Sequence, residues 1–117
     1  MFGPKRILVP TDFTADSDRA LREAIDLAAA SRGKVYLLHV DEKIPLVVGE
    51  ALLDPDVVAA AEKSDERLSR QQMAEEVRRV ASGSDVEIEI DERRGGTFEE
   101  IARYTRDKLI DLVVIGP

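Results

Sequence analysis

The chain has 117 residues, no cysteine and one histidine, a length that suits one domain with a sizeable core and a composition that excludes disulfides and argues against an ordinary zinc site. Its formal net charge of −7 and its aromatic content of 4% argue against a nucleic-acid partner, which attracts clustered Lys and Arg. No apolar run approaches the ~20 residues of a membrane helix and no signal-peptide pattern opens the chain, so we expect a soluble, cytoplasmic protein without a membrane partner.

The first element is an unbroken apolar run over 7–9 that ends at Pro10. A run without alternation predicts a strand covered on both faces, in the middle of a parallel sheet. Proline stops the ladder because it has no N–H to donate. Thr11 and Asp12 therefore lie at the carboxyl end of a central strand, where open α/β sheets place their ligand crevice. Asp12 is the first candidate functional residue, although a turn or cap role also fits it, and both interpretations stay open for Thr11.

Apolar residues recur at helical spacing over 14–30, which predicts a helix with Gly33 as its stop. Three residues could provide its N-cap: Thr14, Asp16 and Ser17. The apolar run over 35–40 predicts a second buried strand, and the two strands with their helix make a right-handed βαβ unit.

The segment 41–54 has neither a helical nor a strand pattern, and its apolar residues could either pad the core or cover a ligand. Asp54 and Pro55 then predict a helix start, with a helix to about Ala81 and Gly83 beyond it. Its polar middle, 62–72, indicates an exposed outer helix. We expect six of its residues to face inward: Val57, Ala61, Leu68, Met73, Val77 and Val80.

The strict alternation over 86–91 predicts an edge strand, followed by a solvated end at 91–94. After two glycines, Thr97 and Glu100 have the spacing of a capping box. The helix that they begin is expected to turn five residues inward: Phe98, Ile101, Ala102, Thr105 and Leu109.

The last apolar run, 112–115, predicts another doubly buried strand. The elements together predict a doubly wound, open parallel α/β sheet with strand order 3-2-1-4. In that order the fourth strand lies at an edge beyond the first. Its apolar composition indicates that a fifth strand or a partner chain is missing beside it.

These segments, in this order and spacing, resemble the universal stress protein family over essentially the whole chain. The residues that carry the resemblance are 7–14, 37–40, 96–101 and 111–116. It implies the Rossmann-like fold of the adenine nucleotide alpha hydrolase type.

In the nucleotide-binding branch of this family, ATP with Mg²⁺ or Mn²⁺ lies at the carboxyl ends of the first and fourth strands. The resemblance implies that Pro10, Thr11 and Asp12 meet the adenosine, with Asp12 near the ribose and in indirect contact with the metal on the phosphates. It also implies that the backbone of Val40 reads the adenine edge. Ile115 and Gly116 would begin the phosphate loop.

The chain departs from that branch after Gly116. The branch carries glycine, two residues, glycine, nine residues, then glycine with serine or threonine, leading into a last helix and a fifth strand. Only the first glycine is present, so we expect a single domain over 1–117 that is C-terminally truncated or continues beyond this sequence. Three lost hydrogen bonds to phosphate, each worth about 1.5–3 kcal/mol, would weaken ATP binding roughly a thousandfold or more.

Two functions stay open: a stress-response regulatory module that binds ATP or a related adenine nucleotide, and a module of the same fold that binds no nucleotide and acts as a homodimer or with another protein. No nucleophile, base and orienting residue occur as a set, so we expect at most weak ATP hydrolysis. His39, in an apolar strand, is interpreted as structural. A phosphoacceptor receiver domain would need an acidic pair and a late lysine that this chain lacks.

Overall fold

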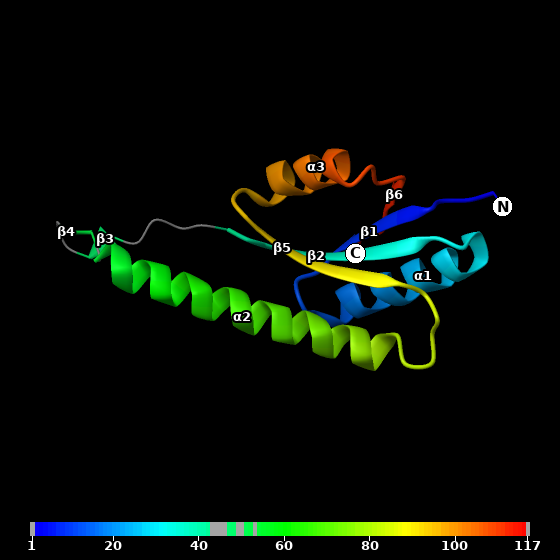
Figure 1. The fold of residues 1–117 in the computed structure, drawn as a ribbon, viewed down its shortest axis with the longest axis horizontal. Helices are drawn as coiled ribbons and strands as arrows, with labels where there is room; N and C mark the ends of the chain where they lie inside the picture. Colours follow the sequence, from blue (N-terminus) through cyan, green and yellow to red (C-terminus); the bar gives the residue numbers. More distant parts are fainter. Residues whose placement is uncertain (1, 43–46, 49–50, 53, 117) are drawn as a thin grey trace.

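The computed structural model describes residues 2–42, 47–48, 51–52 and 54–116. Four parallel strands form one sheet in the order β5-β2-β1-β6, and two short strands form a separate antiparallel pair (Figure 1). In chain order the elements are β1 (Arg6–Pro10), α1 (Ala15–Ser31), β2 (Lys34–Asp41), β3 (Val47–Val48), β4 (Ala51–Leu52), α2 (Pro55–Val80), β5 (Ile88–Arg94), α3 (Thr97–Asp107) and β6 (Leu112–Val113). Since β5 and β6 are the third and fourth strands of the main sheet, the predicted order 3-2-1-4 is confirmed.

Helices cover both faces of the main sheet. α1 and α2 lie on one face and α3 lies on the other (Figure 1). Ile7 and Val9 of β1 join the apolar core under α1 and α2, whereas Leu8 joins the core under α3 with Tyr104. All three strand residues are fully buried, which confirms that the first apolar run is covered on both faces.

α1 begins and ends close to its predicted limits. Thr14 is the N-cap, and its hydroxyl accepts a hydrogen bond from Ser17 N. At the other end the C-cap is Arg32, with a left-handed φ of 57°, and Gly33 follows it directly, as predicted. Gly33 also permits a close approach, because a Cβ there would lie 2.8 Å from Pro4 O.

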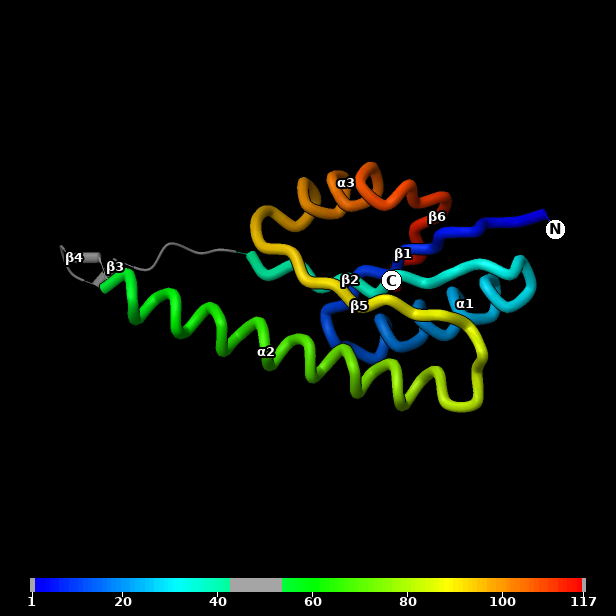
Figure 2. Tube along the Cα trace, in the orientation of Figure 1, coloured from blue at the N-terminus to red at the C-terminus, as the bar shows by residue number. Residues whose placement is uncertain are grey.

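α2 confirms the predicted helix but only part of its predicted buried face. Met73 is fully buried, and Val77 and Val80 pack against the same core. The prediction is wrong for three residues, which are exposed: Val57, Ala61 and Leu68. For Val57 and Ala61 the reason is geometric, because the amino-terminal end of α2 runs past the end of the main sheet (Figure 2). Leu68 instead lies one position off the inward stripe of the helix, which carries Ser69, Met73 and Glu76.

Part of the segment 41–54 forms a small hairpin, in which β3 pairs antiparallel with β4 and Val47 lies opposite Leu52. The prediction of an irregular connection is therefore wrong at these two strands. The alternatives for the apolar side chains of this segment fall outside the described residues.

β5 is an edge strand, as its alternation predicted, but it extends to Arg94 and its end is not simply solvated. Asp91 accepts a hydrogen bond from the Tyr104 hydroxyl of α3 at 2.7 Å. On the other face, Arg94 Nη1 pairs with Glu62 Oε2 of α2 at 2.6 Å. The two helices that flank the strand therefore hold its charged end.

The predicted capping box of α3 does not form. Gly96 is the N-cap, and Thr97 Oγ1 donates to Glu42 Oε1 at 2.7 Å, while Glu100 pairs with Arg103 at 2.9 Å. The buried face of α3 consists of Glu100 and Tyr104, with Ile101 and Thr105 half-buried. Three residues predicted to face inward are exposed instead: Phe98, Ala102 and Leu109.

β6 lies beyond β1 at the other edge of the sheet, as predicted. Val113 and Val114 pack against the cores on opposite faces, but Leu112 is partly exposed and Ile115 is 68% exposed. The prediction of a doubly buried strand is therefore wrong for these two residues. In the described part of the chain no further strand pairs with the outer edge of β6.

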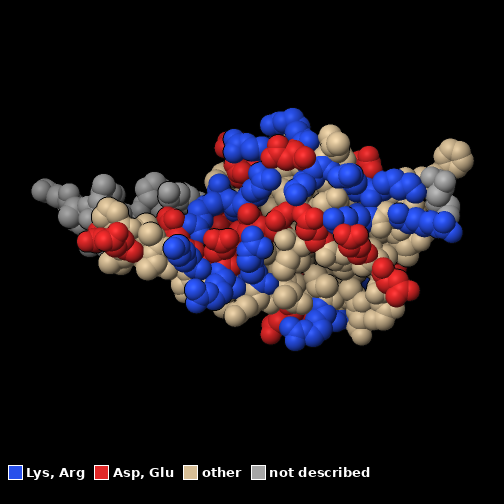
Figure 3. Space-filling view, in the orientation of Figure 1, with Lys and Arg blue, Asp and Glu red and all other residues tan. Residues whose placement is uncertain are grey.

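Charged side chains of both signs are interspersed across the face shown in Figure 3. Lys34 Nζ of β2 pairs with Glu89 Oε1 of β5 at 2.9 Å, and Lys108 Nζ at the end of α3 reaches the same carboxylate at 3.2 Å.

Among the described residues no helix has both the length and the apolar character needed to cross a membrane.

Candidate functional site

The turn after β1 lies at the carboxyl end of an inner strand. Thr11 N donates to Leu38 O at 2.8 Å, so pairing with β2 continues one residue past Pro10 before the chain turns. Thr11 is buried and Asp12 is exposed. Phe13 follows with a φ of 66°, a left-handed conformation that is unusual for a bulky residue and that is often found at binding sites. The sequence pattern gave no sign of this conformation.

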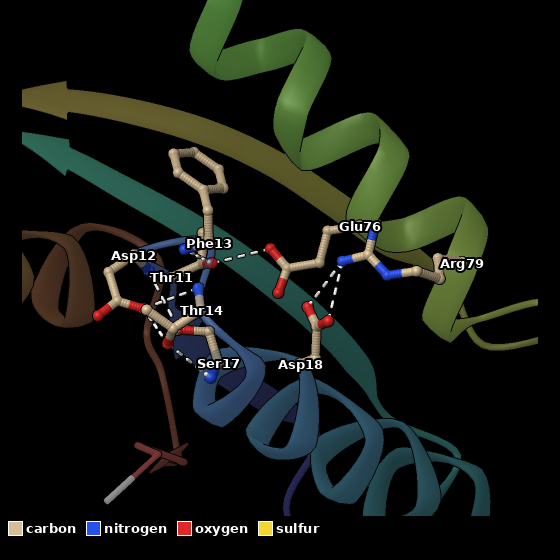
Figure 4. Close-up of polar contacts among 8 residues, drawn as sticks. All are labelled: Thr11, Asp12, Phe13, Thr14, Ser17, Asp18, Glu76 and Arg79. Atoms are coloured by element: carbon tan, nitrogen blue, oxygen red, sulfur yellow. Dashed lines mark hydrogen bonds and ion pairs between the residues drawn. The ribbon is translucent and has the colours of Figure 1, made fainter.

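The Asp12 carboxylate closes the turn onto α1. Its Oδ1 accepts hydrogen bonds from Ser17 Oγ at 2.5 Å, Thr14 Oγ1 at 2.5 Å and Thr14 N at 3.2 Å. The bonds from Ser17, and then those from Thr14, lower the pKa of Asp12 below its ordinary value. Figure 4 shows the second carboxylate oxygen pointing away from the turn. Asp12 thus has the turn role that we considered, and it keeps one charged oxygen for a ligand.

Glu76 of α2 belongs to the same region, and the sequence analysis missed it. Its side chain is buried, with 2% of the residue exposed, and its Oε1 accepts a hydrogen bond from Thr11 Oγ1 at 2.8 Å. Burial, and then the neighbouring Asp18 carboxyl, raise the pKa of Glu76 to about 7. The sequence gives only the spacing, which places Glu76 three positions after Met73 on the same face of α2, and this spacing alone does not show that the carboxyl is buried.

Asp18 and Arg79 extend this contact between the helices. Arg79 Nη2 donates to Asp18 Oδ2 at 2.9 Å and to Asp18 Oδ1 at 3.0 Å (Figure 4). Burial raises the pKa of Asp18, but its interaction with Glu76 and its hydrogen bonds with Arg79 outweigh burial and lower it. These contacts join the β1 turn to α1 and α2 through four residues: Thr11, Asp18, Glu76 and Arg79.

His39 of β2 packs beside the turn. Its ring centroid lies 4.7 Å from that of Phe13, and its buried Nδ1 has no hydrogen-bond partner among the described residues. Burial lowers the pKa of His39, so the ring is neutral at pH 7. The contact gives His39 a packing role against the left-handed residue of the turn.

The end of β6 meets the first turn of α1. A Cβ at Gly116 would lie 2.5 Å from Asp16 O, so this backbone can approach the helix only because residue 116 is glycine. The structure therefore brings Gly116 to the amino end of the helix that Pro10, Thr11 and Asp12 lead into. Ile115, next to Gly116, has an exposed side chain.

Val40 is set apart from the other predicted site residues. It lies two residues beyond Leu38, the partner of Pro10, and it is paired with Arg93 of β5. Its side chain packs against the core under α3.

The turn offers one hard metal ligand. Within the described ranges no group of three or more His, Asp or Glu side chains could hold a metal ion. The outward oxygen of Asp12 suits Mg²⁺, which keeps several waters and is usually bound by one or two carboxylates plus substrate phosphates. This donor set fits a metal that arrives with a nucleotide and does not fit a resident ion.

The strand order, the helices on both faces and the polar turn at an inner strand's carboxyl end define a doubly wound α/β protein with its candidate site at the crevice edge. Comparison with known proteins makes this class specific. The model of the universal stress protein family matches residues 3–117. The chain belongs to the universal stress protein family.

Individual relatives agree with this assignment. A curated universal stress protein of Methanocaldococcus jannaschii is 27% identical over 112 residues, which are 96% of this chain but only 64% of that relative. The universal stress protein UspA from Lactobacillus plantarum has a TM-score of 0.76 at 21% identity, covering 98% of this chain and 78% of that one. A universal stress protein in complex with cAMP has a TM-score of 0.58 at 21% identity, covering 97% and 73%. At such identities the structural likeness establishes the fold.

Proposed function

We propose that the chain binds an adenine nucleotide at the carboxyl ends of β1 and β6 and acts as a regulatory module in the stress response. Family membership supports this, and so does the similar structure solved in complex with cAMP. The observation that carries the proposal is the packing of Gly116 on Asp16. It sets the end of β6 beside the polar turn after β1, so the two strand ends that the proposal requires lie together.

Each residue has a role in this proposal. Pro10, Thr11 and Asp12 bind the adenosine, and the outward oxygen of Asp12 accepts a hydrogen bond from the ribose or contacts phosphate-bound Mg²⁺ or Mn²⁺ through water. The backbone of Val40 contacts the adenine edge. Ile115 and Gly116 lead towards the phosphates. Ser17 and Thr14 hold Asp12 in one orientation, which reduces the entropy cost of binding.

Phosphate groups should add little at the amino end of α1. Asp16 and Asp18 place negative charge in the first turn of this helix, where a phosphate would otherwise be favoured. We therefore expect the adenosine part to supply most of the binding free energy, and we expect no substantial ATP hydrolysis.

Isothermal titration calorimetry tests this proposal with adenosine, AMP, cAMP and Mg-ATP. The four affinities should lie within about tenfold of one another, because the chain reads the part that they share. A form of the protein that carries the full phosphate loop should bind Mg-ATP about a thousandfold tighter than the 117-residue chain does. Absence of heat from every ligand at millimolar concentration, in both forms, would rule the function out.

Asp12→Asn is the matched variant for the turn. Asparagine keeps an Oδ1 acceptor for Ser17 and Thr14, so the turn survives, but it removes the charge that faces the ligand. We expect Mg-ATP affinity to fall about tenfold or more. Asp26→Asn, an exposed site farther along α1, should change nothing. Equal effects of the two variants would contradict the role of Asp12.

The edge of β6 supports a second candidate, an interaction module that binds no nucleotide. Leu112 and Ile115 expose apolar surface beside unpaired strand edge, which favours pairing with another chain. Light scattering that shows a stable dimer whose calorimetry is silent would favour this candidate over nucleotide binding. A charged Ile115→Lys should dissociate such a dimer.

A further inference from the structure

A buried carboxyl on α2 lies directly behind the proposed site. Glu76 is almost inaccessible to solvent, and Met73 and Val77 on the same stripe belong to the apolar core or pack against it. The Glu76 Oε1 accepts a hydrogen bond from Thr11 Oγ1 at 2.8 Å, so α2 holds the turn through one side chain. Nothing in the binding roles given above requires this carboxyl.

The hydrogen bonds at Thr11 join the turn to α2. Phe13 N–H donates to Thr11 Oγ1 at 3.0 Å, and the Thr11 hydroxyl donates to Glu76 Oε1 at 2.8 Å. Because Oε1 already accepts this hydrogen bond, Oε2 is the oxygen that we expect to carry a proton when Glu76 is neutral.

The surroundings of Oε2 favour a proton there. Oε2 is buried without a hydrogen-bond partner in the described part of the chain, and Figure 4 shows it on the side of Asp18. Arg79 is the cation that binds Asp18, and Arg22 acts on it from a greater distance. The Arg79 guanidinium is thus shared by the carboxyl groups of Asp18 and Glu76. Two neighbouring carboxyl groups that share one cation cannot readily both be ionised.

The pKa values agree with this geometry. Burial and the interaction with Asp18 raise the pKa of Glu76 to about 7, whereas Thr11 and Arg79 act in the opposite direction. His39, packed on Phe13 at the other side of the turn, has its pKa lowered by burial and offers no compensating charge at neutral pH. A change of charge on Glu76 therefore falls inside the physiological pH range.

We propose that Glu76 is a positioning residue, which holds the β1 turn for the nucleotide through Thr11 while it carries a proton and loosens the turn when the proton is lost. The ionised carboxylate, itself buried, would face the Asp18 carboxylate, and the resulting repulsion would push α2 away from the turn. This inference rests on the proposed function. It adds that proton concentration regulates nucleotide affinity.

Adenosine is the probe for the first test, because the nucleoside does not change charge between pH 6 and pH 8. Calorimetry on the 117-residue chain should show adenosine affinity about fivefold weaker at pH 8 than at pH 6, an ordinary size for coupling between sites. In Glu76→Gln the affinity should be the same at both pH values and equal to the wild-type value at pH 6. Glutamine imitates the protonated acid, because its amide oxygen accepts from Thr11 and its amide nitrogen can donate towards Asp18.

Matched variants separate positioning from general stability. Glu75→Gln changes the exposed neighbour on α2 and should keep the wild-type pH dependence. Thr11→Val removes the hydroxyl and should abolish the dependence, and Thr11→Ser should restore it. The inference is overturned if Glu76→Gln keeps the wild-type pH profile or if Glu75→Gln loses it.

A second measurement works without any ligand. The backbone amide resonance of Phe13 should titrate with a midpoint near pH 7 in the wild-type chain and should not titrate in Glu76→Gln. Asp18→Asn should move the midpoint to lower pH, because it removes the carboxyl that helps to raise the pKa of Glu76. If adenosine does not bind, the proposed function fails, and the amide titration still decides whether Glu76 controls the turn. An amide that is silent near pH 7 in the wild type would refute that control.

Discussion

The two halves of α2 differ in what lies beneath them. The second half packs Met73 and Glu76 against the sheet and α1, whereas none of the residues 55–67 of the first half is buried and Val57 is 59% exposed. The cause is length: 26 helical residues span about 39 Å, and the eight residues of β2 span only about 26 Å. One continuous helix therefore has a half that the core holds and a half that the core does not reach. Helical periodicity predicts the helix, but only the size of the sheet decides which apolar positions are covered.

The largest expected effect comes from shortening one apolar side chain in each half. Met73→Ala should lower the free energy of unfolding by about 4 kcal/mol, because it leaves a cavity at a fully buried position. Val57→Ala, in the first half of the same helix, should change it by less than about 0.5 kcal/mol. Urea unfolding monitored by circular dichroism measures both. Similar losses for the two variants would mean that the first half is also buried in solution.

The next effect uses the buried acid in the second half. The pKa of Glu76 is raised from 4.5 to about 7 on folding, so the folded chain binds this proton more tightly than the unfolded chain does. Its stabilising contribution is full below pH 4.5 and is lost as the pH rises through about 7, a change of about 3 kcal/mol at 1.36 kcal/mol per pKa unit. Unfolding free energies at pH 5 and pH 8 should show this loss in the wild type relative to Glu76→Gln. Parallel pH profiles for these two proteins would contradict the raised pKa, and Glu75→Gln provides the control.

Local sequence rules predicted the elements better than their contacts. Thr14, one of the three candidate caps, caps α1, and its partner Ser17 is only three residues away in the sequence. Thr97 does not cap α3 because its hydroxyl donates to Glu42, which directly follows β2. A local sequence pattern does not include a partner that lies so far away along the chain.

The candidate site shows the same difference between features that a local sequence pattern predicts and features that depend on tertiary contacts. The position of Thr11 and Asp12 at the end of an inner strand follows from one apolar run and one proline, and the strand order bears that position out. Glu76 was missed because a charged residue in a polar stretch is ordinarily solvated, and only the packing of α2 on the β1 turn shows that it is buried. The left-handed Phe13 also depends on tertiary contacts, since its ring lies on His39.

The smallest expected effect concerns what holds the first half of α2 to the sheet. Arg94 Nη2 donates to Glu62 O at 2.8 Å, and Arg94 Nη1 pairs with Glu62 Oε2 at 2.6 Å. These contacts attach the end of β5 to α2 near the second turn of the helix. Arg94→Gln should lower the global free energy of unfolding by no more than about 1 kcal/mol, since the side chain is partly exposed and solvent screens the pair. It should nevertheless speed amide hydrogen exchange over 58–66, because regions with few apolar contacts open locally without global unfolding. Exchange over 73–80 should not change, and Arg67→Gln, at an exposed site in the first half, should leave both segments as they are. If amide exchange in Arg94→Gln rises equally in both halves, α2 opens as one unit. The two halves would then differ in burial but not in their opening motions.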